Sequence, residues 1–226
     1  MTVVLDHLFI CTLPGAPEAE PVAALGLAEA ASSIHPGQGT SSRRFFLRNA
    51  MIECLWVHDE QEARSALIRP THLWERWRYR GAGASPFGVA LRPDASDASP
   101  APAAPFESWV YKPPYLPEPL SFAMGQNASV IEEPLCFYMP FGRRPDTVAA
   151  EHRHPLEHPL GCQELTALRL ILPYALPVSP VLHTLAQLGI ASFSRGPGHL
   201  AEVVLDEGAQ GQRVDFQPAL PLIMYY

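Results

Sequence analysis

A histidine and a glutamate in two apolar, β-rich segments are the residues of this 226-residue sequence best suited to chemistry. Alternation along a strand gives each of them apolar neighbours on its own face: His7 lies with Val3, Leu5, Phe9 and Cys11, and Glu53 lies with Met51, Leu55 and Val57. Burying a carboxylate among such side chains is costly unless the group is paired, protonated or bound to a metal. The two residues therefore predict either a satisfied buried hydrogen bond or a reactive site.

Two kinds of chemistry follow if these side chains meet in one hollow. Imidazole nitrogen and carboxylate oxygen are ligands for divalent zinc, manganese, iron or nickel. An ion held by them could polarise two neighbouring oxygens of a substrate. Glu53, when it is not a permanent ligand, is the candidate catalytic base. Nucleophilic catalysis finds no support, because the sequence has no Gly-x-Ser-x-Gly motif and no cysteine with an evident activating partner.

One arginine, Arg169, is a candidate for binding a charged group of a substrate. Arg169 could hold a substrate carboxylate, since a guanidinium forms bidentate pairs with carboxylates. Its alternative role is a plain ion pair with Glu53 or Asp215. Arg43 and Arg44 are neighbours on one expected strand, so alternation sends one of them to each face.

Three further groups complete the candidates. His35 begins a glycine-bearing loop, which either approaches a ligand closely or only forms a turn. Trp109 and Tyr111 belong to a set of aromatic side chains that either pack in the core or form an apolar lid over a substrate. His154 and His158 lie in a polar segment that Pro155 and Pro159 keep from being helical, which favours an exposed loop. One of these two histidines as a further metal ligand stays open.

Hydrophobic periodicity predicts the same order of elements, βαβββ, near both ends of the chain. In the first module we expect strands at 3–12, 31–35, 43–48 and 51–58, with a helix at 17–27. In the second module we expect strands at 165–172, 190–194, 200–205 and 213–217, with a helix at 180–188. The modules, residues 1–60 and 165–226, are predicted to form one compact α+β unit.

Residues 61–164 are expected to be an inserted arm and linker between the modules. The sequence has 25 prolines, many of them in this region, and proline neither donates to a β-ladder nor fits a helix interior. The region is also rich in aromatic residues, which disordered linkers lack. We therefore expect an ordered, largely extended arm, partly helical at 60–79.

The N-terminal part of the chain resembles a glyoxalase-like domain of the vicinal oxygen chelate superfamily, the fold of glyoxalases, bleomycin-resistance proteins and dioxygenases. The resemblance covers about the first 95 residues and rests on these segments: Leu5-Asp6-His7-Leu8-Phe9-Ile10, His35-Pro-Gly-Gln-Gly-Thr40, Arg43-Arg44-Phe45-Phe46, Ile52-Glu53-Cys54-Leu55-Trp56-Val57, and a run from Gly83 to Pro93 that is similar to an uncharacterised branch. It implies that the two modules form a cupped mixed sheet around a small-molecule cleft, often with a divalent metal in the cup.

The resemblance also implies where a metal would bind. The superfamily's ligands lie in the middle of the first and last strands of each module. In this sequence the positions are His7 and Glu53 in the first module, and Ala167 and Asp215 in the second. Because alanine has no ligand group, the implied set is His7, Glu53 and Asp215.

Composition and charge disfavour several classes of protein. Sixteen basic and 23 acidic residues give a net charge of −7, without the clustered basic face that nucleic-acid binding needs. No signal peptide and no membrane-spanning apolar run is recognised, and the four scattered cysteines suit a reduced, cytoplasmic protein. No nucleotide cofactor is expected. Superfamily relatives often pair, so a homodimer through the apolar run Leu220–Tyr226 is compatible with the sequence.

The expected function is action on a small organic molecule with neighbouring oxygens, by isomerase, lyase or dioxygenase chemistry with a divalent ion. The alternative is a metal-free protein that sequesters a small molecule between aromatic walls, as bleomycin-resistance relatives do. In a third reading Arg169 takes the place of the ion.

Overall fold

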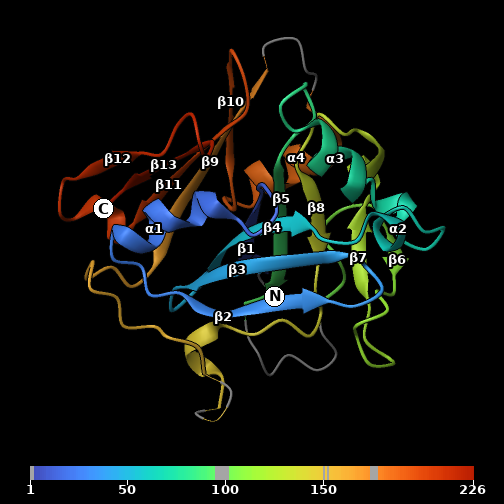
Figure 1. Cartoon of the computed structure of the whole chain (residues 1–226), viewed down its shortest axis with the longest axis horizontal. Coiled ribbons are helices and arrows are strands. Elements are labelled where there is room, and N and C mark those ends of the chain that lie inside the picture. Colours follow the sequence, from blue (N-terminus) through green and yellow to red (C-terminus); the bar gives the residue numbers. More distant parts are fainter. Residues whose placement is uncertain (1–2, 95–101, 150, 152, 174–177) are drawn as a thin grey trace.

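The computed structural model describes residues 3–94, 102–149, 151, 153–173 and 178–226. These residues form an α+β fold with two mixed sheets, one of eight strands and one of five (Figure 1).

The first half of the eight-stranded sheet contains the elements expected for the N-terminal module. Its strands are β1 (Val3–Cys11), β2 (Ala30–His35), β3 (Thr40–Phe46) and β4 (Met51–Val57). A helical turn at Pro17–Ala19 and helix α1 (Glu20–Ala24) connect β1 to β2. Strand β1 pairs in parallel with β4. Strand β3 lies on the other side of β4, and β2 forms one edge of the sheet.

The second half of the same sheet comes from the middle of the chain. Its strands are β5 (Phe87–Pro93), β6 (Ser108–Tyr111), β7 (Phe122–Gly125) and β8 (Leu135–Tyr138). The order across the sheet is β2-β3-β4-β1-β5-β8-β7-β6. Strand β5 pairs in parallel with β8, as β1 does with β4, and β1 and β5 meet antiparallel at the centre.

From the sequence we expect this middle region to be largely extended connection, whereas it supplies half of the larger sheet. The prolines misled the expectation, because they lie mainly outside the strands. Pro113, Pro114, Pro117 and Pro119, for example, fall in the loop between β6 and β7. Several aromatic residues of the region, including Trp109, Phe122 and Phe137, lie in the strands.

Short helices precede the second half, as the sequence predicts for residues 60–79. They are α2 (Glu60–Ala63), a turn at Arg69–Thr71, and α3 (Leu73–Tyr79). The indole Nε1 of Trp77 donates to the carbonyl oxygen of Thr12 at 2.8 Å, which holds α3 against the end of β1.

Arg76 on α3 is completely buried and organises the loop between β7 and β8. Its guanidinium donates to backbone carbonyls of this loop and of the chain just before α3: Thr71, His72, Ala128, Val130 and Glu133. Burial lowers the pKa of Arg76 to about 10. The loop is thus held by an internal cation that carbonyl dipoles solvate in place of water.

The C-terminal residues form the five-stranded sheet. Its elements are β9 (Leu165–Pro173), α4 (Pro180–Gln187), β10 (Ser192–Gly196), β11 (Leu200–Leu205), β12 (Arg213–Asp215) and β13 (Leu222–Tyr225). The order is β10-β9-β11-β13-β12. Further 3-10 turns lie at Gln126–Ser129, Pro145–Thr147 and Asp206–Gly208.

The expectation that this C-terminal module shares a cupped sheet with the N-terminal module is wrong. Both edges of β1 are occupied, by β4 and β5, and both edges of β9 are occupied, by β10 and β11. Neither first strand therefore has free backbone groups with which to join the other module's sheet.

Instead the two sheets pack face to face. One apolar cluster contains side chains from the back face of the eight-stranded sheet, from α1 and α4, and from the inner face of the five-stranded sheet. Leu220, Leu222 and Met224 belong to this cluster and are at most 1 % exposed. The C-terminal run considered as a dimer contact is therefore part of the protein's own core.

A β-bulge interrupts the regular alternation of β1. The pairing of β1 with β5 shifts between Leu5 and His7, so Asp6 is an extra residue. Val3 and Leu5 consequently pack with the cluster on the back face, while Phe9 belongs to a second cluster on the front face. The expected grouping of His7 with Val3 and Leu5 is wrong for this reason.

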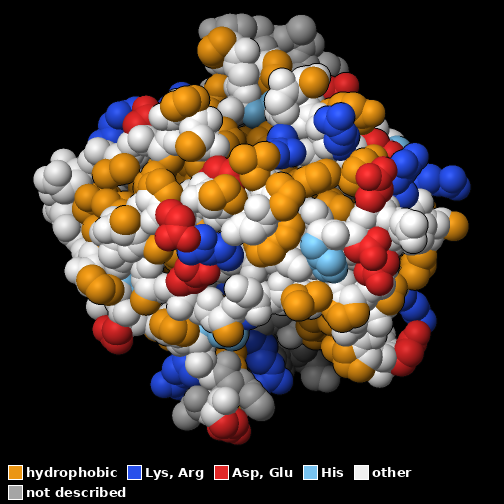
Figure 2. Space-filling view, viewed as in Figure 1, with side chains coloured by type: hydrophobic (Ala, Val, Ile, Leu, Met, Phe, Trp, Pro, Cys, Tyr) orange, Lys and Arg blue, Asp and Glu red, His pale blue; other side chains and the backbone are white. Residues whose placement is uncertain are grey.

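The surface carries charges of both signs. On the face seen in Figure 2, acidic and basic side chains lie interspersed among apolar ones. Within the described ranges, no helix combines the length and apolar character needed to cross a bilayer.

Candidate functional site

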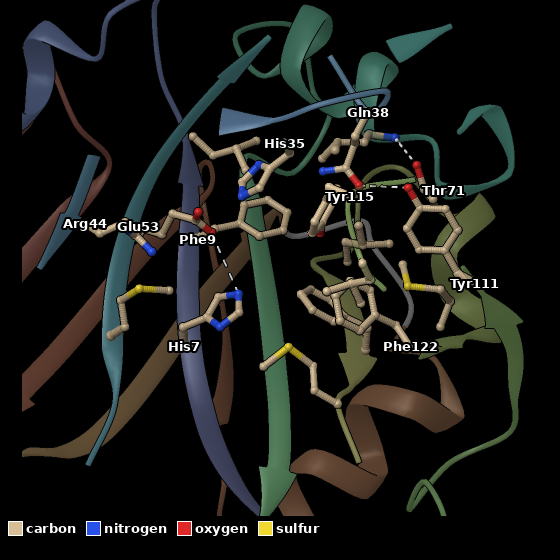
Figure 3. Close-up of a pocket in the computed structure, with 18 of the residues that line it drawn as sticks. His7, Phe9, His35, Gln38, Arg44, Glu53, Thr71, Tyr111, Tyr115 and Phe122 are labelled. Atoms are coloured by element: carbon tan, nitrogen blue, oxygen red, sulfur yellow. Dashed lines mark hydrogen bonds and ion pairs between the residues drawn. The ribbon is translucent and has the colours of Figure 1, made fainter. Parts of the chain in front are cut away.

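A cavity of about 240 Å³ opens on the front face of the eight-stranded sheet, the face opposite the five-stranded sheet (Figure 3). Six polar or charged residues line it: His7, His35, Gln38, Arg44, Glu53 and Thr71. The rest of the lining is apolar or aromatic and includes Phe9, Tyr111, Tyr115, Phe122, Phe137 and Phe141. Three methionines and four leucines complete the lining.

The two halves of the sheet contribute different chemistry to this cavity. His7, His35, Arg44 and Glu53 come from β1, β2, β3 and β4 respectively. Strands β6, β7 and β8 contribute side chains such as Phe137, without an ionisable group other than the phenol of Tyr111. The cavity therefore has one polar wall and one apolar wall.

His7 and Glu53 face each other across neighbouring parallel strands. The imidazole Nε2 of His7 lies 3.8 Å from Oε2 of Glu53, and both side chains are less than 10 % exposed. Register explains the approach, since Glu53 pairs with Phe9, two residues beyond His7 on β1. Figure 3 shows the two side chains turned toward each other at one side of the cavity.

Asp6 fixes the orientation of His7. The imidazole Nδ1 donates to Oδ1 of Asp6 at 2.7 Å, which leaves Nε2 toward Glu53. Regular alternation would send neighbouring side chains to opposite faces, and the bulge at Asp6 allows this contact. Asp6 is held in turn by Arg92, whose Nε lies 3.7 Å from Oδ2 of Asp6.

The surroundings of His7 favour its charged form. Burial alone would lower its pKa, but the hydrogen bond from His7 to Asp6 and the negative charges of Asp6 and Glu53 outweigh burial, so the pKa is raised above 6.5. His7 is therefore suited to donate a proton or a hydrogen bond from Nε2.

His35 has the opposite character. Its Nδ1 lies 2.9 Å from the hydroxyl of Thr40, which accepts from the Gln38 amide at 2.9 Å; Tyr111 donates to the amide oxygen of Gln38 at 2.8 Å. Burial lowers the pKa of His35 despite the opposing charge of Glu53. His35 is thus a neutral imidazole held by a buried hydrogen-bond chain.

The loop after His35 forms a tight turn and also serves the cavity. Gly37 and Gly39 adopt φ angles of 77° and 75°, which residues with a Cβ rarely adopt. A Cβ on Gly37 would lie 2.6 Å from Cβ of Pro114, so the turn packs closely against the β6–β7 loop. The structure therefore confirms the turn and places Gln38 against the cavity, while close approach of the loop to a ligand stays a prediction.

The structure brings together four of the residues singled out from the sequence: His7, Glu53, His35 and Tyr111 all line the cavity. Trp109 does not line it. Its side chain packs beside Tyr111, with ring centroids 6.1 Å apart, and supports the apolar wall from behind.

Arg169 and Asp215 lie far from this group in the fold, on the five-stranded sheet. Arg169 pairs with Glu202 at 3.3 Å, and Asp215 pairs with Arg213 at 2.8 Å. The expectation that Arg169 and Asp215 share a cup with His7 is wrong, because their sheet covers the opposite face of the eight-stranded sheet. Ala167 lies on the same remote strand, β9.

The two histidines left open as further ligands have structural roles. His158 accepts from the backbone N–H of Ala28 at 3.0 Å and donates to the carbonyl of Phe46 at 2.9 Å. His154 stacks on the ring of Phe46 with centroids 3.9 Å apart. Neither residue lines the cavity.

Asp6, which contacts His7, and Arg44, which lines the cavity, are among the residues that the sequence did not assign to the site. Asp6 is missed because regular alternation places it on the opposite face from His7. Arg44 lines the cavity although Arg169 was the predicted guanidinium. The alternation of Arg43 and Arg44 was the available signal, but it does not tell which of the two faces holds a cavity.

The donor set does not fit a resident metal ion by itself. His7 and Glu53 offer two donors, fewer than the three or four protein ligands typical of zinc sites. In the other half of the sheet the central positions are Ala90, opposite His7, and Phe137, opposite Ala90. Among the residues that the structure describes, no group of three or more His, Cys, Asp and Glu side chains is placed to hold an ion.

Comparisons with known proteins support the fold alone. No protein-family model matches the chain, and no curated protein matches it in sequence. The crystal structure of a hypothetical protein from Staphylococcus aureus is similar, with a TM-score of 0.51, 10 % sequence identity and 99 % of each chain covered. A hypothetical protein from Bacillus halodurans has a TM-score of 0.38 and 12 % identity, over 62 % of this chain and 94 % of its own.

Proposed function

We propose that the protein transfers a proton on a small carbonyl compound bound in the cavity, with Glu53 as the base and His7 as the acid. The observation that carries the proposal is the pair itself: a carboxylate and an imidazole with a raised pKa, 3.8 Å apart, at the polar wall of an otherwise apolar cavity. Perturbed ionisable groups in such a cavity are typical of acid–base sites.

The proposed reaction needs no group from outside the protein. A carbonyl oxygen of the substrate accepts a hydrogen bond from Nε2–H of His7, and the adjacent C–H points to the carboxylate of Glu53. Glu53 takes the proton, the C–H electron pair moves into the new C=C bond, and the oxygen becomes an enolate that His7 stabilises or protonates. Protonation of the oxygen by His7 gives the enol tautomer, and return of a proton from Glu53 to the same carbon regenerates the ketone with exchange of its hydrogen.

The likeness to a glyoxalase-like cup also supports the proposal in a revised form. We propose that the two halves of the cup are β1–β4 and β5–β8, rather than the two ends of the chain. The support is the strand arrangement: the first and last strands of each half pair in parallel, and the two first strands meet antiparallel. The cavity lies on the face shared by both halves.

The test follows proton exchange on phenylpyruvate, a compound with neighbouring oxygens, an acidic methylene group and an aromatic ring. In D₂O the wild-type protein should accelerate exchange of the methylene protons, measured by NMR. Glu53→Gln should reduce this rate about 100-fold or more, since general bases contribute about 10²- to 10⁴-fold. Asp215→Asn, outside the cavity, serves as the matched control and should keep the wild-type rate.

A sequestering role is the second candidate, favoured by the predominantly apolar and aromatic lining. Tight binding of phenylpyruvate without accelerated exchange would support sequestration and contradict the proposed reaction. Equal exchange rates for wild type and Glu53→Gln would also contradict it.

The divalent ion expected from the family resemblance has its own measurement. Elemental analysis of protein purified without chelators reports bound zinc, manganese, iron or nickel. If His7 and Glu53 bind an ion, the variants His7→Gln and Glu53→Gln should both lose it. If the site is metal-free, EDTA should leave the rate of proton exchange unchanged.

A further inference from the structure

Arg43 and Arg44 are neighbours in the sequence, but their guanidinium groups have different surroundings. Arg43 faces away from the cavity and is fully paired, with Glu29 at 2.6 Å and Glu20 at 2.7 Å. Arg44 lies on the other face of β3 and lines the cavity. The sequence gives both residues the same chemistry, but only Arg44 can reach a bound molecule.

The guanidinium of Arg44 has no acidic partner. Its Nε and Nη2 donate to the carbonyl oxygen of Ala31 at 3.3 and 2.8 Å, and its Cζ lies 5.4 Å from the ring centroid of Phe46. Across the described part of the chain, no carboxylate lies within 4.0 Å of it. Burial lowers the pKa of Arg44, with the charge of Glu53 opposing this effect.

Register places Arg44 beside the proposed reacting groups. Arg44 pairs directly with Glu53 across β3 and β4, but the two side chains do not form an ion pair. The two carboxylates nearest these groups have other neighbours: Asp6 pairs with His7 at 2.7 Å, and Glu53 lies 3.8 Å from His7, so neither forms an ion pair with Arg44. A half-buried cation without a carboxylate is unusual, because charged groups in such surroundings are normally paired.

We infer that Arg44 binds the carboxylate of a ligand, so that the cavity is a site for organic acids with an apolar or aromatic body. The inference rests on the proposed function for the identity of the site, and it adds the class of substrate. A planar guanidinium can hold a carboxylate through two parallel hydrogen bonds. The apolar wall then encloses the body of the acid, His7 faces the ketone oxygen next to its anionic end, and Glu53 faces the C–H group beyond the ketone.

The test compares two probes that differ only in charge, 3-phenylpropanoate and 3-phenylpropanamide, by titration calorimetry. Wild-type protein should bind the acid about tenfold or more tightly than the amide, the size expected for a hydrogen-bonded charge pair. Arg44→Met should remove this preference, because it should lower the affinity for the acid and leave the affinity for the amide unchanged. Arg44→Lys should keep part of it.

Arg169→Met is the matched control, because it removes a partly exposed arginine from the remote sheet and should keep the preference. Equal affinity of the wild-type protein for acid and amide, or no binding of either, would overturn the inference. So would an unchanged preference in Arg44→Met.

The two proposals fail separately in these measurements. Neither phenylpropanoate nor its amide has the ketone that the proton transfer needs, so their binding reports only on Arg44. A preference for the acid that depends on Arg44, without exchange on phenylpyruvate, would leave the inference standing and reject the reaction. Exchange that survives in Arg44→Met with an unchanged Michaelis constant would reject the inference alone.

Discussion

The two halves of the eight-stranded sheet share one arrangement of strands but carry opposite chemistry. In β1–β4 the cavity-facing positions include His7, Arg44 and Glu53, whereas in β5–β8 they include Phe122 and Phe137. The same backbone pattern thus supports a polar wall on one side of the centre and an apolar wall on the other. In the proposed reaction this difference corresponds to a division of roles, in which the first half supplies the reacting groups and the second half encloses the substrate.

The halves also differ in how their connections are supported. Helix α1 follows β1 and packs into the apolar cluster through Val22. In the second half, the loop that joins β7 to β8 is held by the buried guanidinium of Arg76. A cation outside the strands therefore supports the loop between two strands of the apolar wall, together with the hydrogen bond from Asn127 to Glu133.

Removing the guanidinium of Arg76 is expected to have the largest effect on the apolar half of the sheet. Arg76→Met should lower the free energy of unfolding by about 3 kcal/mol or more, because several buried carbonyls lose their donor at once. Urea unfolding measures the change. Arg78→Met, on the exposed side of the same helix, is the matched control and should stay within about 0.5 kcal/mol. A similar effect of both substitutions would argue against the anchoring role of Arg76.

A smaller effect is expected from a substitution of Phe137, which tests whether the two halves have separate roles in binding and reaction. Phe137 touches both walls, with its ring centroid 5.6 Å from that of His7 and 5.4 Å from that of Phe122. Phe137→Leu should cost about 1 kcal/mol of stability. It should raise the Michaelis constant for phenylpyruvate more than it lowers the rate at saturation.

Phe193→Leu provides the control for that experiment, since Phe193 packs against the core from β10 on the remote sheet. It should also reduce stability, but it should leave the Michaelis constant unchanged. If Phe137→Leu instead lowered the saturated rate alone, the second half would take part in the reaction and the division of roles would be wrong.

The smallest expected effect concerns the polar wall and is a dependence on pH. His7 has a raised pKa in the folded protein, so its contribution to stability is complete below its unfolded value of 6.5 and is lost as pH rises through the folded value. Asp6→Asn removes the charge that opposes the effect of burial, so the pKa of His7 should fall. NMR titration of the imidazole measures the pKa directly.

Unfolding experiments at about pH 6 and about pH 8 provide the second readout. The His7 contribution should decrease in the wild-type protein as pH rises above 6.5, and this decrease should be smaller in Asp6→Asn. An unchanged pKa of His7 in this variant would show that the bulge does not control the charge of the imidazole.

The sequence predicted the elements of this fold better than their arrangement. Strands β1 to β4, the helical segment at 60–79 and the elements from β9 to β12 follow from local periodicity, which depends on neighbouring residues. Which strands pair depends on free ladder edges, and no local pattern encodes them. The strands of the middle region and β13 were missed because proline content and the chain end suggested other roles.

The site could also be predicted only in part, because some of its residues follow from local sequence pattern and others depend on how the strands are arranged. His7 and Glu53 were recognisable as polar residues in apolar strands, and the structure places both at one cavity. Asp215 and Arg169 were assigned by counting positions in a module that lies in a different sheet. Arg44 and Asp6 depend on which face is hollow and where one strand is irregular, and both features appear only in three dimensions.

The extra residue in β1 has a consequence for how this site can change in evolution. Deleting Asp6 would restore a regular pleat in which Val3 and Leu5 stay on the core face, so the strand would keep its packing and lose only the carboxylate that orients His7. The extra residue is therefore not required by the core, and its role is confined to the imidazole. We expect homologous chains that retain the histidine to retain the extra residue, and chains that have lost the histidine to be free to lose it.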